Sequence, residues 1–346
     1  MPHRTKSIIA ELPEPETLDF AALVECWRAG DVGLFVVLGP TASGKTKFAV
    51  RLARSLADCG LPGAEIISAD SRQVYRGMDI GTGKDLADYD GIPYHLIDIA
   101  DPGEGYNVYR FREDFFRVYD DILSRGAVPI LCGGTGLYIN SVLNGYNFEE
   151  HIPLSSLRSG ASVDGCLTSE AKRFGVTAPS VKHSINCEEA VGCLTSEAKR
   201  FGVTAPSVKH SINCKEAVGC LTSEAKKLGV TAPSVRHAAS SLRPFVIGTL
   251  VSREVRNARI DARLKARLEE GMVDEIKGLL DSGVPAEVLI GYGLEYRFVT
   301  RFVLGEITYD EMFSGLSTAI HQFAKRQMTW FRGMERSGVR IHWVEV

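Results

Sequence analysis

The sequence predicts an α/β protein built on a parallel sheet, with helices toward its C-terminal end and a repetitive segment inserted between the two parts. Between residues 32 and 150, short apolar runs alternate with amphipathic stretches of helical period, as strand–helix–strand units require. A glycine-rich octapeptide at 39–46 stands between the first apolar run and the first amphipathic stretch. Residues 242–346 are mainly helical in pattern, whereas 165–237 consist of near-identical copies.

The α/β part contains four expected strands and two clear helices. The apolar runs predict strands at 34–39, 64–70, 93–99 and 127–134. The amphipathic stretches predict helices at 44–60, ended by Gly60, and at 109–126. Toward the C-terminus, two long helical blocks at 253–283 and 309–338 precede a short final strand, "VRIHWVEV". This succession corresponds to a mononucleotide-binding type of half-domain followed by helices that complete it.

Copies of a 27-residue unit fill most of the interval between the two parts. The unit at 165–191 returns at 192–218 with one change, Glu188 to Lys215, and a third, shorter copy covers 219–237. The period suits two short helices and their turns, so a helical insertion is expected. The chain then divides into an N-terminal extension, an α/β core, the insertion and a helical part that completes the core, at 1–31, 32–150, 151–241 and 242–346.

Composition limits the partners of the protein. The net charge is only −3 over 346 residues, so a nucleic acid would have to be met by a local basic surface. There is no long apolar segment and no signal-peptide pattern, so we expect a cytoplasmic protein without a membrane partner. The eight cysteines form no C-x-x-C pair, which argues against structural zinc. We further expect a monomer.

The octapeptide "GPTASGKT" predicts a phosphate-binding loop of the P-loop NTPase type. Its glycines let backbone N–H groups face phosphate oxygens, and the helix that follows presents its positive N-terminal end. Lys45 would add a positive charge, and the Thr46 hydroxyl would suit a Mg²⁺ ion. The expected phosphate-binding residues are Gly39, Pro40, Thr41, Ala42, Ser43, Gly44, Lys45 and Thr46.

The segments after the later strands argue against nucleotide hydrolysis. The strand at 64–70 ends in Asp70, but the polar, glycine-bearing sequence "SRQVYRGMDIGTGK" that follows is more typical of a substrate wall than of a metal clamp. The strand at 127–134 ends without an acid, and its glycines and Thr135 would bring backbone and one hydroxyl close to a ligand. A P-loop kinase of small molecules remains possible on these residues alone.

Five segments together resemble the tRNA dimethylallyltransferase (isopentenyltransferase) family. They are "GPTASGKT", "ISADSRQVYRGMDIGTGK", "PYHLIDI", "GGTGLYINSVLNG" and "FAKRQMTWFR", and the likeness spans 32–150 and 242–343. The resemblance implies transfer of a dimethylallyl group from dimethylallyl diphosphate to N6 of the adenine at tRNA position 37, next to the anticodon. The loop would then hold a diphosphate that leaves as a unit, with Mg²⁺ as cofactor.

The resemblance also assigns roles to individual positions. It implies that Asp70 is the general base that accepts the N6 proton as the C–N bond forms. Thr135 would touch the substrate between diphosphate and adenine, and Lys45 would stabilise the leaving group. Asp70 and the three residues after it, Ser71, Arg72 and Gln73, match positions that contact tRNA.

Basic side chains of the helical part are the remaining candidates for contact with the anticodon arm. Arg256, Arg259, Arg263 and Arg267 are spaced so that they share one helix face. Basic residues interleaved with aromatic ones in the second block suit phosphate contact and base stacking. The predicted tRNA contacts from these blocks are Arg259, Arg263, Lys325, Arg326 and Arg332.

The repeat segment of this chain departs from the pattern of the tRNA dimethylallyltransferase family. Its members carry an arginine-bearing R-x-x-R-A-x-E helix where this chain has the repeats, and the repeats contain no such motif. Other functions therefore stay open. One alternative is an enzyme that prenylates free adenine nucleotides. A second is an inactive core that carries the repeats as an RNA- or protein-binding module. A third is a family enzyme whose activity the insertion has impaired.

Overall fold

A computed structural model describes residues 13–144 and 242–346 of the chain. The predicted repeats, and the start of the N-terminal extension, lie outside these described residues. A six-stranded sheet in the order β3-β2-β4-β1-β5-β6 forms the centre, and every pairing in it is parallel. Its strands are β1 (Leu34–Leu38), β2 (Ala64–Ser68), β3 (Tyr94–His95), β4 (Val128–Gly133), β5 (Pro244–Leu250) and β6 (Ile341–Glu345).

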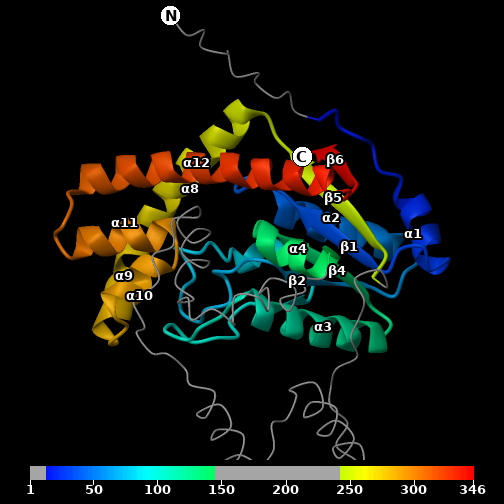
Figure 1. The fold of residues 1–346 in the computed structure, drawn as a ribbon, viewed down its shortest axis with the longest axis horizontal. Helices are drawn as coiled ribbons and strands as arrows, with labels where there is room; N and C mark the ends of the chain where they lie inside the picture. Colours follow the sequence, from blue (N-terminus) through cyan, green and yellow to red (C-terminus); the bar gives the residue numbers. More distant parts are fainter. Residues whose placement is uncertain (1–12, 145–241) are drawn as a thin grey trace, which may run out of the picture. The chain divides into compact units, whose positions relative to one another are not determined.

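Helices cover both faces of this sheet and extend beyond one end of it (Figure 1). Those of the first part are α1 (Phe20–Arg28), α2 (Lys45–Asp58), the 3₁₀ turn η1 (Leu86–Tyr89), α3 (Val108–Ser124) and α4 (Gly136–Asn144). Those of the second part are α8 (Arg253–Glu269), α9 (Met272–Asp281), α10 (Ala286–Gly291), α11 (Leu294–Val303) and α12 (Tyr309–Arg336). None of the described helices is long and apolar enough to cross a bilayer.

The predicted α/β class is confirmed, and the differences are local. The four strands expected before residue 150 all form, and the final strand forms as β6. Strands β1, β2 and β4 are one or two residues shorter than predicted, whereas the strand predicted at 93–99 is reduced to Tyr94–His95. Strand β5 and helices α1, α4, α10 and α11 were not predicted. The first helical block is two helices rather than one, because Gly271 takes a φ of 105° between them. Only glycine enters that region of backbone conformation without strain.

Side chains of β1 alternate between two hydrophobic cores, one on each face of the sheet. Leu34, Val36 and Leu38 join a core formed with α3, α4 and α12. Phe35 and Val37 face the other way, into a core formed with α1 and α2. This alternation follows from the two-residue period of an extended strand. The central strands are buried on both faces, which explains why they appear in the sequence as continuous apolar runs.

Parallel strands place their carboxyl ends at one edge of the sheet, and β2, β4 and β1 are neighbours there. The loops that follow them, at 69–84, 134–135 and 39–44, therefore meet at the same edge. Helix α12 contacts two of these loops, at Thr41 and at Gly134. Its start is fixed by a capping box, in which Thr308 and Glu311 bond each other's backbone N–H groups.

Candidate active site

The predicted phosphate loop lies between β1 and α2, and hydrogen bonds tie its buried side to the sheet. Ala42 (φ 60°) and Gly44 (φ 79°) take left-handed conformations that turn the chain into α2. The Thr249 hydroxyl of β5 donates to the Leu38 carbonyl, at 3.3 Å, and lies 2.7 Å from the buried Ser43 hydroxyl. Since Thr249 donates its one proton to Leu38, Ser43 donates to Thr249. The buried face of the loop is thus tied to the sheet.

Lys45 occupies the first turn of α2 at this edge. Burial lowers the pKa of its ammonium group, and Arg263 and Arg267 act in the same direction, whereas Cys132 and Asp70 oppose them. Its Cε lies 3.6 Å from the position that a Cβ would take at Gly134, so the side chain extends toward the turn after β4. A desolvated cation near other cations favours an anionic ligand.

Asp70 and Thr135 lie next to each other across the ends of β2 and β4. The Thr135 hydroxyl accepts the Ser71 N–H at 3.1 Å, and the Thr135 N–H donates to the Ala69 carbonyl at 3.2 Å. The Arg72 N–H donates to Asp70 Oδ1 at 2.9 Å. The Thr135 hydroxyl keeps its own proton to donate, and Asp70 keeps its Oδ2 to accept one. The two residues that the sequence singled out are therefore adjacent.

Gln73, a predicted tRNA contact, uses both ends of its side-chain amide within the chain. Its Oε1 accepts from the Ser68 hydroxyl at 3.0 Å. Its Nε2 donates to the Gly83 carbonyl at 3.0 Å. The side chain thus braces the loop after β2, and contact with tRNA stays a prediction.

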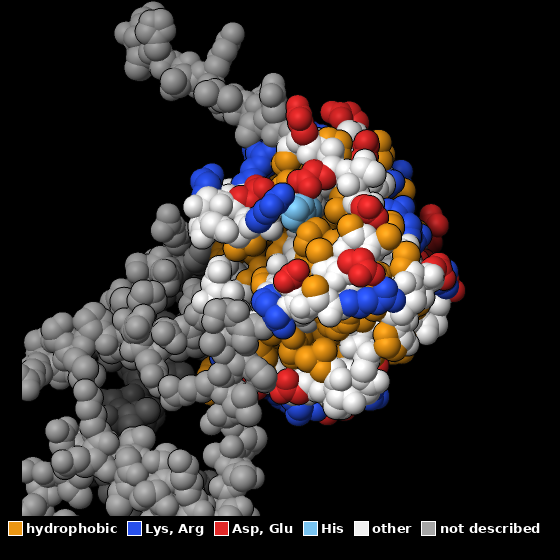
Figure 2. Space-filling model, turned by 90° about the vertical axis from the view of Figure 1, so that its right-hand side faces the viewer, with side chains coloured by type: hydrophobic (Ala, Val, Ile, Leu, Met, Phe, Trp, Pro, Cys, Tyr) orange, Lys and Arg blue, Asp and Glu red, His pale blue; other side chains and the backbone are white. Residues whose placement is uncertain are grey.

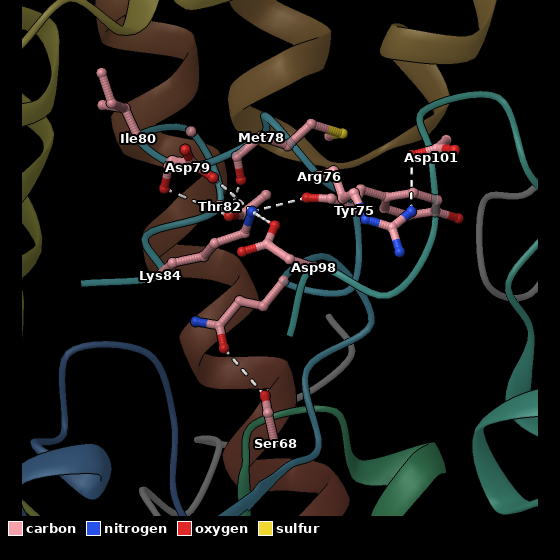
Figure 3. Close-up of polar contacts among 12 residues, drawn as sticks. Ser68, Tyr75, Arg76, Met78, Asp79, Ile80, Thr82, Lys84, Asp98 and Asp101 are labelled. Atoms are coloured by element: carbon pink, nitrogen blue, oxygen red, sulfur yellow. Dashed lines mark hydrogen bonds and ion pairs between the residues drawn. The ribbon is translucent and has the colours of Figure 1, made fainter. Parts of the chain in front are cut away.

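A buried lysine organises the rest of that loop. Lys84 is only 2% exposed, and its Nζ donates to the Tyr75 carbonyl at 2.8 Å (Figure 3). The same atom pairs with Asp79, at 2.5 Å, and with Asp98. Three acceptors match the three protons of an ammonium group, so the charge is fully satisfied. This cluster could not be predicted from the sequence, because its members are scattered over 24 positions of an irregular segment.

Glu275 of α9 holds the same loop from the helical part. Its Oε2 accepts the N–H groups of Asp79 and Ile80, both at 2.7 Å, and its Oε1 accepts that of Gly81 at 3.0 Å. The Tyr296 hydroxyl donates to Oε1 at 2.6 Å. The ring of Tyr296 packs so closely on Gly81 that a Cβ there would lie 2.7 Å from it. Sequence reasoning missed this contact too, since it joins segments almost 200 residues apart.

Helix α8 brings its arginines to the phosphate loop and to the loop after β2. Arg263 pairs with Asp85 and donates to the Gly83 carbonyl at 3.4 Å, and the largely buried Arg267 lies 3.7 Å from the same carboxylate. The exposed Arg259 has its Nη1 3.9 Å from the position of a Cβ on Gly44. Arg259 makes no hydrogen bond or ion pair within the described ranges. Both predicted tRNA-binding arginines of this helix thus lie beside the expected anion site.

Helix α12 turns one face outward and another toward the site. Lys325 and Arg326 are exposed, and the Arg326 guanidinium stacks on the ring of Phe323 at 5.9 Å from its centroid. Arg332 follows Lys325 by two turns and so lies on the same side of the helix. On the inner side, Trp330 packs against Gly136, where a Cβ would lie 2.2 Å from the indole. Gly136, the first residue of α4, thus makes room for α12.

One face of the molecule away from α12 and the loops carries charges of both signs (Figure 2). Figure 2 shows the face on the right-hand side of Figure 1, where Lys and Arg side chains lie among Asp, Glu and hydrophobic ones. That face presents no extended surface of one sign. The small net charge agrees with such mixing, and a localised basic surface is what an RNA partner requires.

Comparison with known proteins identifies the family of this chain. The family model "IPP transferase" matches residues 73–175 and 215–334, and "Isopentenyl transferase" matches 32–89. The chain is 46% identical to tRNA dimethylallyltransferase 2 of Bacteroides fragilis, over 91% of this chain and 93% of the relative. It is 45% identical to tRNA dimethylallyltransferase 1 of Parabacteroides distasonis, over 90% and 92% respectively.

The chain belongs to the IPP transferase family. A solved structure of this family, the tRNA isopentenylpyrophosphate transferase of Bacillus halodurans, is 29% identical and superposes with a TM-score of 0.57. The match covers 90% of this chain and 89% of that one. The first family model leaves 176–214 unmatched, and this stretch falls inside the predicted repeats. The resemblance stated from five motifs is thereby confirmed.

Two further residues of this IPP transferase were missed by sequence reasoning. Glu295, in the first turn of α11, has its pKa raised by burial, and Arg267, Asp70 and Arg263 are the side-chain charges that act on it. Gln327 of α12 is buried against the phosphate loop. A polar residue on the apolar stripe of an amphipathic helix was the available signal for Gln327. Glu295 gave no signal, because its neighbours come from other segments.

Proposed function

We propose that this protein transfers a dimethylallyl group from dimethylallyl diphosphate to N6 of the adenine at tRNA position 37, and that it acts as a monomer. The observation that carries the proposal is the placement of Asp70 and Thr135 beside Lys45 and the phosphate loop. A base, a hydroxyl donor and an anion site at one sheet edge suit alkyl transfer with loss of a diphosphate. Family membership supplies the substrates. All these groups belong to one chain, so no second copy is needed.

The phosphate loop stabilises the charge that builds on the leaving oxygen as the allylic C–O bond breaks. Lys45 and the N-terminal end of α2 provide positive potential at this point. Arg259 and Arg263 extend the same field from α8, so they serve the diphosphate as well as any tRNA phosphate nearby. Only interactions that strengthen in the transition state accelerate the reaction, and these are of that kind.

Asp70 receives the proton that the adenine N6 loses. The amine attacks the allylic carbon as the C–O bond breaks, and the nitrogen becomes cationic and therefore acidic. Asp70 Oδ2 then takes one proton, while the Arg72 N–H holds Oδ1 in place. Thr135 is fixed by its bonds to Ser71 and Ala69 and donates its hydroxyl proton toward the diphosphate or the adenine. The products are N6-dimethylallyladenosine and diphosphate.

The residues at the loop also fit the expected Mg²⁺ ion. Mg²⁺ is commonly held by one or two protein oxygens together with phosphate oxygens and water, rather than by a full protein cage. The Thr46 hydroxyl at the start of α2 is such an oxygen. When bound, the ion would neutralise diphosphate charge.

The function is tested by transfer of a labelled dimethylallyl group to unmodified tRNA in the presence of Mg²⁺. Asp70→Asn should lower the rate by about 10²–10⁴-fold, the usual contribution of a general base, while diphosphate binding persists. Asp58→Asn is the matched control. It lies at the far end of α2, about 20 Å from Lys45 along a 14-residue helix, and should leave transfer unchanged.

Three results would contradict the proposal in whole or in part. Label in free adenine nucleotides but not in tRNA would indicate a small-molecule prenyltransferase. Turnover of ATP without any prenyl transfer would indicate a kinase. Full activity of Asp70→Asn would remove Asp70 from the mechanism.

A further inference from the structure

Gln327 is a polar side chain in an apolar position. It is 8% exposed, and it lies on the buried stripe of α12. The other buried residues of this helix are all hydrophobic: Met312, Leu316, Ile320, Ala324, Met328, Phe331 and Met334. Burying an amide is unfavourable unless its groups are hydrogen-bonded. The side chain must therefore be judged by the bonds it makes.

Both of those bonds go to loops of the site. Gln327 Oε1 accepts the Thr41 N–H of the phosphate loop at 2.8 Å. Its Nε2 donates to the Gly134 carbonyl, in the turn after β4, at 2.9 Å. One amide thus bridges the segment that carries Lys45 and the segment that carries Thr135. A Cβ at Gly134 would lie 2.6 Å from Nε2, so the contact is tight.

The bridge also decides which backbone groups of the loop are left for an anion. The Thr41 N–H is used by Gln327, and the Ser43 N–H donates to the Pro40 carbonyl at 3.2 Å. Within the described ranges, no hydrogen bond occupies the N–H groups of Ala42, Gly44, Lys45 and Thr46. These groups remain to bind phosphate oxygens. Their positions depend on where the loop begins, and Gln327 holds that point.

We propose that Gln327 is a positioning residue of the diphosphate pocket, whose amide sets the spacing between the phosphate loop and the turn that carries Thr135. The inference rests on the proposed function. It assigns to α12 a part in holding the diphosphate, besides the predicted tRNA contacts on its outer face. Gln327 itself touches neither diphosphate nor adenine in this assignment. Its effect passes through the backbone at Thr41 and Gly134.

The test compares variants by their affinity for inorganic diphosphate with Mg²⁺, measured by calorimetry. Gln327→Met keeps an unbranched side chain of similar volume but removes both hydrogen bonds, and it should weaken diphosphate binding by about tenfold or more. In steady-state kinetics the KM for dimethylallyl diphosphate should rise by a similar factor, while the KM for tRNA changes by less than about threefold. Gln322→Leu, an exposed change on the same helix, is the control and should bind diphosphate as the wild type does.

A second variant reaches the same contact from the other side. Gly134→Ala places a methyl group against Nε2 and should also weaken diphosphate binding. The double variant should bind diphosphate about as tightly as whichever single variant binds it less tightly. The reason is that both changes disrupt the same contact, between Gln327 and Gly134. If Gln327→Met fails to fold, Gly134→Ala alone carries the test.

The outcomes separate this inference from the proposed function. Folded Gln327→Met or Gly134→Ala protein that binds diphosphate as tightly as the wild type overturns the positioning role. A lowered Tm with unchanged diphosphate affinity does so too, because it shows a purely structural amide. Wild-type protein that binds diphosphate but labels no tRNA contradicts the proposed function alone. Wild-type protein that binds no diphosphate contradicts both.

Discussion

Replacement of Glu275 by glutamine should loosen the loop that follows Asp70. The carboxylate accepts three backbone N–H groups, from Asp79, Ile80 and Gly81, and the Tyr296 hydroxyl. A glutamine amide can keep its oxygen toward Asp79 and Ile80 and donate to the Tyr296 oxygen. It then presents an N–H to the Gly81 N–H, which loses its acceptor.

The magnitude follows from those bonds. A hydrogen bond to a charged acceptor contributes about 1.5–3 kcal/mol, and one between neutral groups about 0.5–1.5 kcal/mol. The bonds from the Asp79 and Ile80 N–H groups change from the first kind to the second, so each becomes weaker by about 1 kcal/mol. The unpaired Gly81 N–H adds about 1 kcal/mol or more. Because this region is partly exposed and water screens part of the loss, we expect a net change of about 2–3 kcal/mol in the free energy of opening the loop.

Hydrogen exchange measures this opening directly. A change of about 2–3 kcal/mol corresponds to about 30- to 150-fold faster exchange of the amides at 79–81, since about 1.4 kcal/mol is tenfold. Mass spectrometry of the peptide that covers these residues gives the rate. Glu113→Gln, at an exposed position of α3 without a partner among the described residues, is the control. Exchange at 79–81 that stays within about threefold of wild type would refute the reasoning.

Two further predictions concern the helical part. Gly83→Ala should destabilise the protein and slow prenyl transfer more than Gly77→Ala does. Both glycines have positive φ, 62° at Gly83 and 67° at Gly77, but only a Cβ at Gly83 would clash with Arg267, whose Nη2 would lie 1.5 Å from it. Equal melting temperatures and transfer rates for the two variants would contradict this prediction. Asp261→Asn should remove an acid-dependent part of the stability, because the hydrogen bond from His321 holds the Asp261 pKa below its ordinary 3.8. A lowered pKa means that this stability is present above pH 3.8 and is lost as the pH falls through the folded-state pKa. The urea midpoints of the variant and the wild type should therefore converge in acid. A difference between the two midpoints that stays constant with pH would count against the prediction.

Some of the site could be predicted from the sequence because it is built by local contacts. The phosphate loop is defined by a strand, two glycines and a helix start within about 25 residues, and its conformation depends on those neighbours. Asp70 and Thr135 each end an apolar run, and parallel strands bring such ends together. Residue type and position along the strand were therefore sufficient for these three features.

Other parts could not be predicted for the opposite reason. Strand β5 has an apolar sequence, "PFVIGTL", but its partner β1 lies more than 200 residues earlier, so no local pattern shows the pairing. The α8 arginines share a helix face as predicted, yet only the fold shows that Arg263 meets Asp85. The assigned tRNA contacts of Ser71, Arg72, Lys325, Arg326 and Arg332 stay predictions.

The sequence by itself determined the fold class, the glycine-rich turn between β1 and α2 and the family, because these depend on periodicity, on glycine backbone freedom and on short motifs. The tertiary structure alone decided how the helical part completes the site. Gln327 reaches Thr41 across 286 positions, and Glu275 reaches the loop at 79–81 across about 195. Such contacts depend on where whole helices pack against the sheet. Hydrophobic burial fixes that packing, and it is spread over many residues rather than encoded in any one segment.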